Sequence, residues 1–207
     1  MDNSIQSGSV ISYDYATRKN TLQRKSDRNA ARALQFEEAM FNWRSRHLIL
    51  VLTLSYKQQW QNTISLDTIR QHRDKLLNNR RCNQLLEGIN GYIWKIEEGQ
   101  NSGGLHLHVV IFYDGECRAD IHFAQRIGEY WVNVITQGKG AYWNSNAQKD
   151  CHASHGHGIG TGQIDRHNDA RRTALRQNLL YLAKNEQQAS NCMNPHFHMF
   201  GTSQFPT

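Results

Sequence analysis

The sequence has few of the residues that interrupt or cross-link a chain. It contains 2 prolines and 15 glycines among 207 residues, too few for a collagen-like or linker-rich protein. Its 4 cysteines form no Cys-x-x-Cys pair, so the sequence suggests neither a zinc ribbon nor a dense disulfide framework. We therefore expect an ordinary globular protein whose cysteines are reduced.

Long apolar runs are also missing. A run such as Leu48 to Leu52 is far too short to cross a bilayer. Residues 1–20 are largely polar and lack the basic segment followed by a long apolar one that typifies a secretion signal. We expect no membrane partner and a cytoplasmic location.

Positive charge is in excess. The chain has 24 Lys and Arg against 18 Asp and Glu, a formal net charge of +6, which weakly favours a polyanionic partner such as nucleic acid. Hydrophobic residues make up 38% of the chain, so there is enough apolar side chain for one domain with a real core.

The apolar pattern predicts helices alternating with strands. Residues 1–25 have no sustained apolar periodicity, so we expect a mobile arm there and a single domain over residues 26–207. The periodicities predict helices over 26–46, 65–80, 120–138 and 165–188, strands over 47–54, 91–98 and 105–113, and weaker strands near 158–164 and 197–200. This order predicts an α+β fold, with helices packed on an antiparallel sheet and 138–162 mainly loop.

The main chemical signal lies in the strand that follows the glycine-rich turn at residues 99–104. His106 and His108 alternate with apolar residues, so both imidazoles project from the same face of the strand, about 7 Å apart. Two imidazoles on one rigid strand can hold a metal ion. With 11 histidines in the chain, such a triplet by itself proves little.

A third ligand is expected from the preceding strand, which ends in Glu97 and Glu98. Residues directly opposed in an antiparallel hairpin share a face, so Glu97 reaches the same ion if it lies opposite His106. A register slip of one residue would bring Glu98 instead. We favour Glu97, and the alternative for either glutamate is a solvated side chain at the hairpin tip.

The last predicted helix carries a tyrosine with polar neighbours. Asn178, Tyr181 and Lys184 are three residues apart and so lie near one face. Tyrosine is a poor nucleophile at its usual pKa of about 10, but metal polarisation of a phosphate and a nearby cation such as Lys184 would ease attack. Taken alone, Tyr181 would more often be an aromatic packed at a helix boundary.

In this order the motifs resemble those of the HUH rolling-circle replication initiators. The matching segments are the strand Val51 to Ser55, the glycine-rich turn into His106-Leu-His108, and Tyr181-Leu-Ala-Lys184. Segments 94–97, 130–136 and 200–203 look most like the single-tyrosine replication proteins of filamentous phages (inoviruses). The resemblance spans residues 43–203.

This resemblance implies a five-stranded antiparallel sheet and a Mg²⁺ or Mn²⁺ ion held by His106, His108 and Glu97. It implies that Tyr181 nicks and joins single-stranded DNA at a replication origin through a 5′-phosphotyrosine intermediate, with Lys184 orienting the phosphate or the tyrosinate. The implied partners are origin DNA, with a hairpin, and a host helicase or polymerase in the cytoplasm of a bacterial host cell. A transposase or relaxase with the same chemistry, and a non-catalytic nucleic-acid-binding regulator, are the alternatives.

Further residues are candidates for DNA contact, because basic grooves with stackable rings suit single strands. They are Arg172, Arg176 and Asn178 on the late helix, and Trp60 and Trp143 in predicted loops. Trp94 and Trp131 are expected in the core.

Two other histidine groups compete with this site. Cys151, His152, His155 and His157 would suit zinc better than magnesium, but their spacing matches no zinc module and their role stays open. The triplet from His196 to His198 has no tyrosine helix after it, and we interpret it as tail structure.

Overall fold

The structure is a computed structural model that describes residues 7–99, 104–149, 160–184 and 198–206. The elements in chain order are α1 (Ser7–Trp43), β1 (Arg46–Tyr56), α2 (Gln58–Gln61), α3 (Leu66–Asn78), η1 (Asn79–Arg81), α4 (Gln84–Glu87), β2 (Ile89–Glu98), β3 (Leu105–Asp114), α5 (Asp120–Tyr130), η2 (Trp131–Ile135), β4 (Gly140–Asn144), η3 (Ser145–Gln148), β5 (Gly162–Asp165), α7 (Asp169–Ala183) and β6 (Phe200–Thr202).

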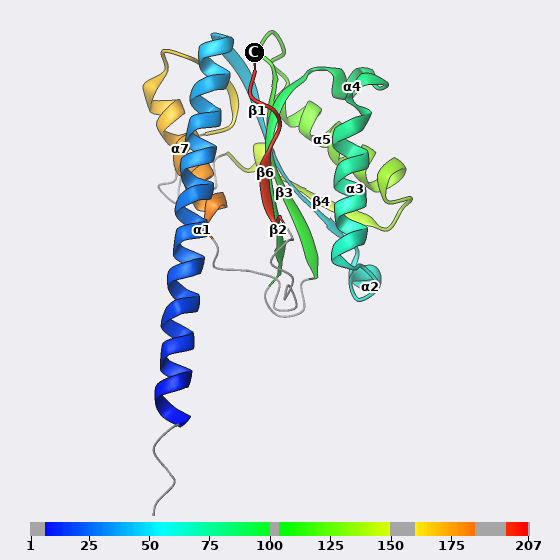
Figure 1. Ribbon diagram of the computed structural model, residues 1–207. Coiled ribbons are helices and arrows are strands. Elements are labelled where there is room, and N and C mark those ends of the chain that lie inside the picture. The colour runs from blue at the N-terminus through cyan, green and yellow to red at the C-terminus, as the bar shows by residue number, and fades with distance from the viewer. Residues whose placement is uncertain (1–6, 100–103, 150–159, 185–197, 207) are drawn as a thin grey trace, which may run out of the picture.

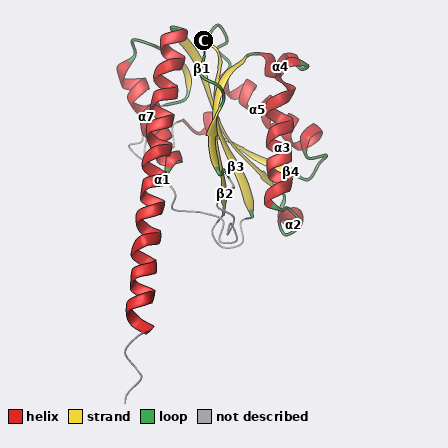
Figure 2. Cartoon of the chain, in the orientation of Figure 1, coloured by secondary structure: helices red, strands yellow, loops and turns green. Residues whose placement is uncertain are grey.

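A six-stranded antiparallel sheet forms the centre of the fold (Figures 1 and 2). Its strand order is β4-β1-β3-β2-β6, and β5 also pairs with β1. Because β1 is long, β4 pairs with its second half, from Leu52 onward, and β5 with its first half, up to Ile49. The α+β class with an antiparallel sheet and flanking helices is confirmed, with one strand more than expected.

Helices cover both faces of the sheet (Figure 1). In β1, Leu48, Leu50 and Leu52 pack in the cluster that includes α3 and α5, whereas Ile49 packs in the cluster that includes α1 and α7. Strand alternation thus divides the core into two layers. The prediction that residues 47–54 form a strand is confirmed. One of its faces is buried throughout, whereas the other is buried at His47 and Ile49 and partly exposed at Val51 and Thr53.

Trp94 and Trp131 lie in the core, as expected. The helix predicted from residue 65 begins with the Ser65 side chain accepting a hydrogen bond from the backbone N–H of Thr68, which satisfies one of the free donors of the first turn. Among the described residues, no helix combines the length and the hydropathy that a membrane crossing requires.

The structure differs from the sequence predictions at α1, β4 and α7. Helix α1 begins at Ser7 and not near residue 26, and its first part extends beyond the sheet (Figure 1); that it moves as an arm stays a prediction. Strand β4 lies in the predicted loop, because its strand character depends on pairing with β1. Helix α7 begins after Asn168, whose side chain accepts from the backbone N–H of Arg171, and it ends at Ala183 and not near residue 188.

A buried carboxylate joins α1 to α7. Glu37 is fully buried, and its two oxygens accept from the Nε atoms of Arg172 and Arg176, each at 2.8 Å. Glu38, half-exposed, adds a contact of 3.1 Å to Arg172. The two arginines expected to bind DNA therefore contribute to the packing of α7 on α1, and their contact with DNA stays a prediction.

We expect Glu37→Gln to lower the free energy of unfolding by about 3 kcal/mol, because breaking a buried ion pair leaves the partner charge uncompensated. The matched control, Glu38→Gln, should lower it by less than about 1 kcal/mol, since half-exposed pairs are worth little. Urea unfolding followed by circular dichroism measures both. Equal losses in the two variants would contradict the assigned role of Glu37.

Candidate metal centre

The β2–β3 hairpin brings three candidate ligands together. Glu97 pairs with His106 across the hairpin, which is the predicted register. His108 Nε2 lies 2.9 Å and His106 Nε2 3.7 Å from the Glu97 Oε2 atom. One ligand atom from each of the three residues lies within 4.8 Å of the other two. The structure thus groups Glu97 with the two histidines, in the predicted register; that it ligates a metal stays a prediction.

This donor set fits a divalent metal ion. Bonds of about 2.1 Å to a central ion place neighbouring ligand atoms about 3 to 4 Å apart, so small side-chain adjustments would seat an ion between these atoms. The three side chains are partly exposed, which leaves room for water or a phosphate oxygen as further ligands. Imidazole and carboxylate together suit several metals, so the geometry supports a metal ion without selecting one.

The protonation state of Glu97 suits metal binding. Burial alone would raise the pKa of its carboxyl group, but hydrogen bonds with His106, His108 and Lys95 outweigh burial and hold that pKa well below its usual value. Glu97 is therefore ionised at neutral pH, which is the form that ligates a metal.

Two residues that sequence reasoning missed support this group. Lys95 is 5% exposed, forms an ion pair with Glu97 Oε1, and donates a hydrogen bond to the carbonyl of Lys184 at the end of α7. Thr53 Oγ1 lies 3.0 Å from His108 Nδ1. With a metal bound, a hydrogen bond from Nδ1–H to Thr53 would leave Nε2 unprotonated as the ligand atom and would fix the orientation of the ring.

The sequence carried a signal for Lys95. Residues two apart in a strand share a face, so Lys95 lies on the face of Glu97. The sequence does not show that the Lys95 ammonium group also contacts the carbonyl of Lys184 at the end of α7, because this contact depends on tertiary packing.

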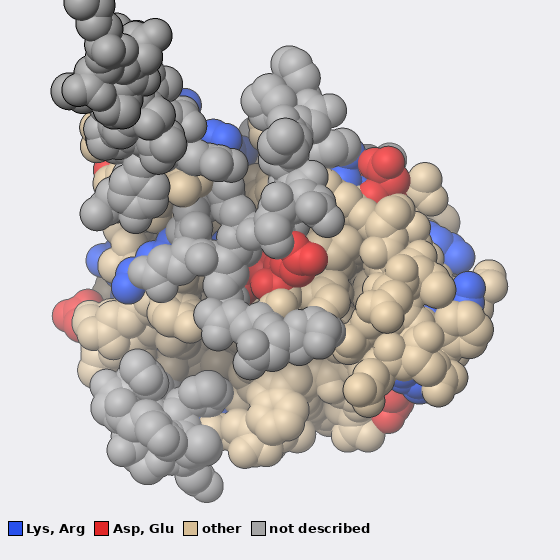
Figure 3. Space-filling view, turned by 90° about the horizontal axis from the view of Figure 1, so that it is seen from below, with Lys and Arg blue, Asp and Glu red and all other residues tan. Residues whose placement is uncertain are grey.

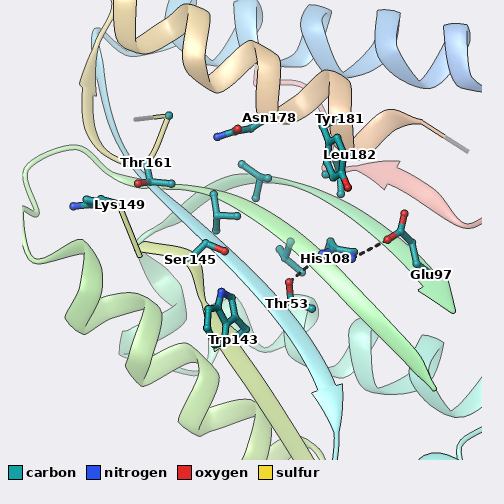
Figure 4. A pocket seen from close by; sticks show the side chains of 14 residues that line it. Thr53, Glu97, His108, Trp143, Ser145, Lys149, Thr161, Asn178, Tyr181 and Leu182 are labelled. Carbon is teal, nitrogen blue, oxygen red and sulfur yellow. Dashed lines mark hydrogen bonds and ion pairs between the residues drawn. The ribbon is translucent and has the colours of Figure 1, made fainter. Parts of the chain in front are cut away.

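Tyr181 projects from α7 on the same side of the sheet (Figure 4). It lines a cavity of about 310 Å³ together with Thr53, Glu97 and His108. Its side chain is not packed in the core, because the residue is 74% exposed. A phenol that is open to solvent and faces a cluster of metal-ligand type can be reached by a phosphodiester.

The other residues predicted to contact DNA or phosphate do not all lie in the cavity of Tyr181. Asn178 and Trp143 line the same cavity as Tyr181, and Trp143 is 57% exposed on β4. Trp60 lines a different cavity. The side chain of Lys184 is not among the groups lining the Tyr181 cavity, so its role toward phosphate or tyrosinate stays a prediction. The group of Cys151, His152, His155 and His157 lies outside the described residues.

Charge around the hairpin end of the molecule is mixed. In the view from below, acidic side chains lie near the centre and at the margins, and basic ones lie mainly toward the margins (Figure 3). On the described part of this face, positive charge is therefore not concentrated into one patch, and a bound polyanion would need cations from elsewhere or from a metal.

Comparisons of the chain with protein-family models, with curated proteins and with solved structures find no match.

Proposed function

We propose that the protein is a metal-dependent endonuclease of the HUH type. It nicks and joins single-stranded DNA and thereby initiates rolling-circle replication of a phage or mobile element. The observation that carries this proposal is the position of exposed Tyr181 in one cavity with Glu97 and His108, beside the third candidate ligand His106.

The chemistry follows from these side chains. A bound Mg²⁺ or Mn²⁺ would polarise the scissile phosphate and reduce the charge repulsion that an attacking oxygen meets. The Tyr181 oxygen forms a bond to phosphorus and loses its proton, and the bond from phosphorus to the 3′-oxygen breaks. That oxygen takes up a proton, which gives a free 3′-OH and a 5′-phosphotyrosine. Attack by a 3′-OH on the phosphotyrosine reverses these steps and joins the strand.

Thr53 and Lys95 position other groups of the site. Thr53 contacts the ring of His108, and Lys95 contacts both Glu97 and the end of α7. The ion pair of Lys95 with Glu97 Oε1 leaves Oε2, the atom that faces the two histidines, for the metal. The same ammonium group contacts the carbonyl of Lys184, three residues after Tyr181. One buried cation thus links the candidate metal ligand to the helix of the nucleophile, which favours a fixed distance between them.

A covalent adduct tests the proposal. We expect the protein, incubated with Mn²⁺ and overlapping 3′-labelled oligonucleotides from the replicon that encodes it, to form a labelled species that survives SDS. The label must be at the 3′ end, because a 5′-phosphotyrosine retains the downstream fragment. EDTA should abolish the species.

Each alternative outcome has a meaning. DNA binding without an adduct on any oligonucleotide would contradict the endonuclease and favour a binding regulator. An adduct formed only on DNA outside a replication origin would favour a transposase or relaxase with the same chemistry.

A further inference from the structure

A second cavity lies on the opposite face of the sheet. It has a volume of about 440 Å³, and Trp60, His72, Lys75 and Lys139 are among its lining residues; we call it the lysine pocket. Helix α3, which carries His72 and Lys75, packs in the core layer that includes Leu107 and Val109. His108 alternates with these residues, so the candidate metal centre is on the other face.

The positive charges of the lysine pocket are not neutralised within the described part of the chain. Lys75 and Lys139 form no ion pair there, and the acidic residues of α3 are bound elsewhere: Asp67 contacts Arg70 and Asp74 contacts Arg73. Both ammonium groups act on one ring, because burial first and then the charges of Lys75 and Lys139 lower the pKa of His72. Two cations near one imidazole favour an anion between them.

An aromatic surface accompanies these cations. The Lys139 Nζ atom lies 5.1 Å from the centre of the Trp60 ring, a cation–π distance that holds the indole beside the charge. Ammonium groups bind phosphates, and an indole face stacks on a base of any sequence. The volume falls within the range of pockets that take small ligands, so the chemistry fits one nucleotide.

Strand β4 connects the lysine pocket to the cavity of Tyr181. Lys139 immediately precedes β4, which lies at an edge of the sheet, and Trp143 on β4 lines the other cavity. Four residues of extended chain span about 13 Å. A single strand of DNA could therefore contact both Lys139 and Trp143 within the site size of about 4 to 16 nucleotides that is usual for a domain that binds single strands.

We propose that the lysine pocket binds a nucleotide of the same single-stranded DNA that is cleaved, with its phosphate between Lys75 and Lys139 and its base against Trp60. The DNA then crosses the β4 edge and is held on both faces of the sheet. The identity of the ligand rests on the proposed function, whereas the binding itself does not depend on cleavage.

The test compares two double variants of equal charge change. Lys75→Gln with Lys139→Gln alters the lysine pocket, and Arg118→Gln with Arg126→Gln removes two exposed charges that do not line it. Binding to 20-mer oligothymidylate is followed by fluorescence anisotropy in EDTA at several salt concentrations. We expect the pocket variant to lose about tenfold or more in affinity, with a salt slope lower by about 0.7, which corresponds to one phosphate contact.

The control variant should bind within about threefold of the unaltered chain, and Trp60→Leu should weaken binding with no change in salt slope. Equal losses in both double variants, or no binding of the oligonucleotide by the unaltered chain, would overturn the assignment of the lysine pocket. Because no cleavage is measured, failure here leaves the adduct experiment unaffected. Conversely, an absent adduct leaves this comparison valid.

Discussion

Tyr181→Phe is expected to lower covalent adduct formation at least about 10³-fold, while DNA affinity stays within about twofold. The substitution removes one oxygen from a side chain that is 74% exposed, so neither the fold nor the ring surface changes. Loss of a nucleophile removes the covalent step itself. Adduct yield on a 3′-labelled oligonucleotide and anisotropy on the same oligonucleotide measure the two quantities.

Tyr142→Phe is the matched control. Tyr142 lies on β4, partly buried against α5, and is not among the residues lining the cavity of Tyr181. Its adduct yield should equal that of the unaltered chain. An adduct that persists in Tyr181→Phe would assign the nucleophile to another residue.

Replacing either histidine of the cluster is the second change with a large expected effect. We expect His106→Ala and His108→Ala each to weaken Mn²⁺ binding by about 10²-fold and to abolish Mn²⁺-supported cleavage. Each variant loses one of three ligands that converge within 4.8 Å, and a metal held by the remaining two is bound weakly. Titration calorimetry with Mn²⁺ measures binding in the absence of DNA.

His122→Ala controls for nonspecific metal binding by imidazoles, because His122 is exposed on α5. It should bind Mn²⁺ as the unaltered chain does. All variants should keep the far-ultraviolet circular dichroism of the fold, since both cluster histidines lie near the turn of the hairpin and are partly exposed. Unchanged Mn²⁺ affinity in His106→Ala and His108→Ala would remove the metal role from this cluster.

Local sequence patterns correctly predicted the β2–β3 hairpin and the placement of Glu97, His106 and His108 on one of its faces. Alternation in β3 fixed the shared face of His106 and His108, and the pairing of Glu97 with His106 follows once the hairpin register is right. These relations need only the geometry of neighbouring strands. The helix cap at Ser65 was likewise readable from sequence because it involves residues three apart.

Interactions between distant segments were not predictable in the same way. Arg172 and Arg176 read as free basic residues, but Glu37, more than a hundred residues earlier, accepts hydrogen bonds from both. The partnership of Lys95 with the end of α7 and the pairing of β4 with β1 depend in the same way on tertiary packing. Local propensity cannot specify such contacts.

The most direct measurement is the identity of the residue that carries the DNA. The SDS-stable adduct is digested with nuclease and trypsin, and tandem mass spectrometry locates the remaining phosphodeoxynucleotide. Cleavage after Arg176 and Lys184 releases residues 177–184, in which Tyr181 is the one tyrosine. We expect the nucleotide on Tyr181, and a nucleotide on any other residue would contradict the proposed function.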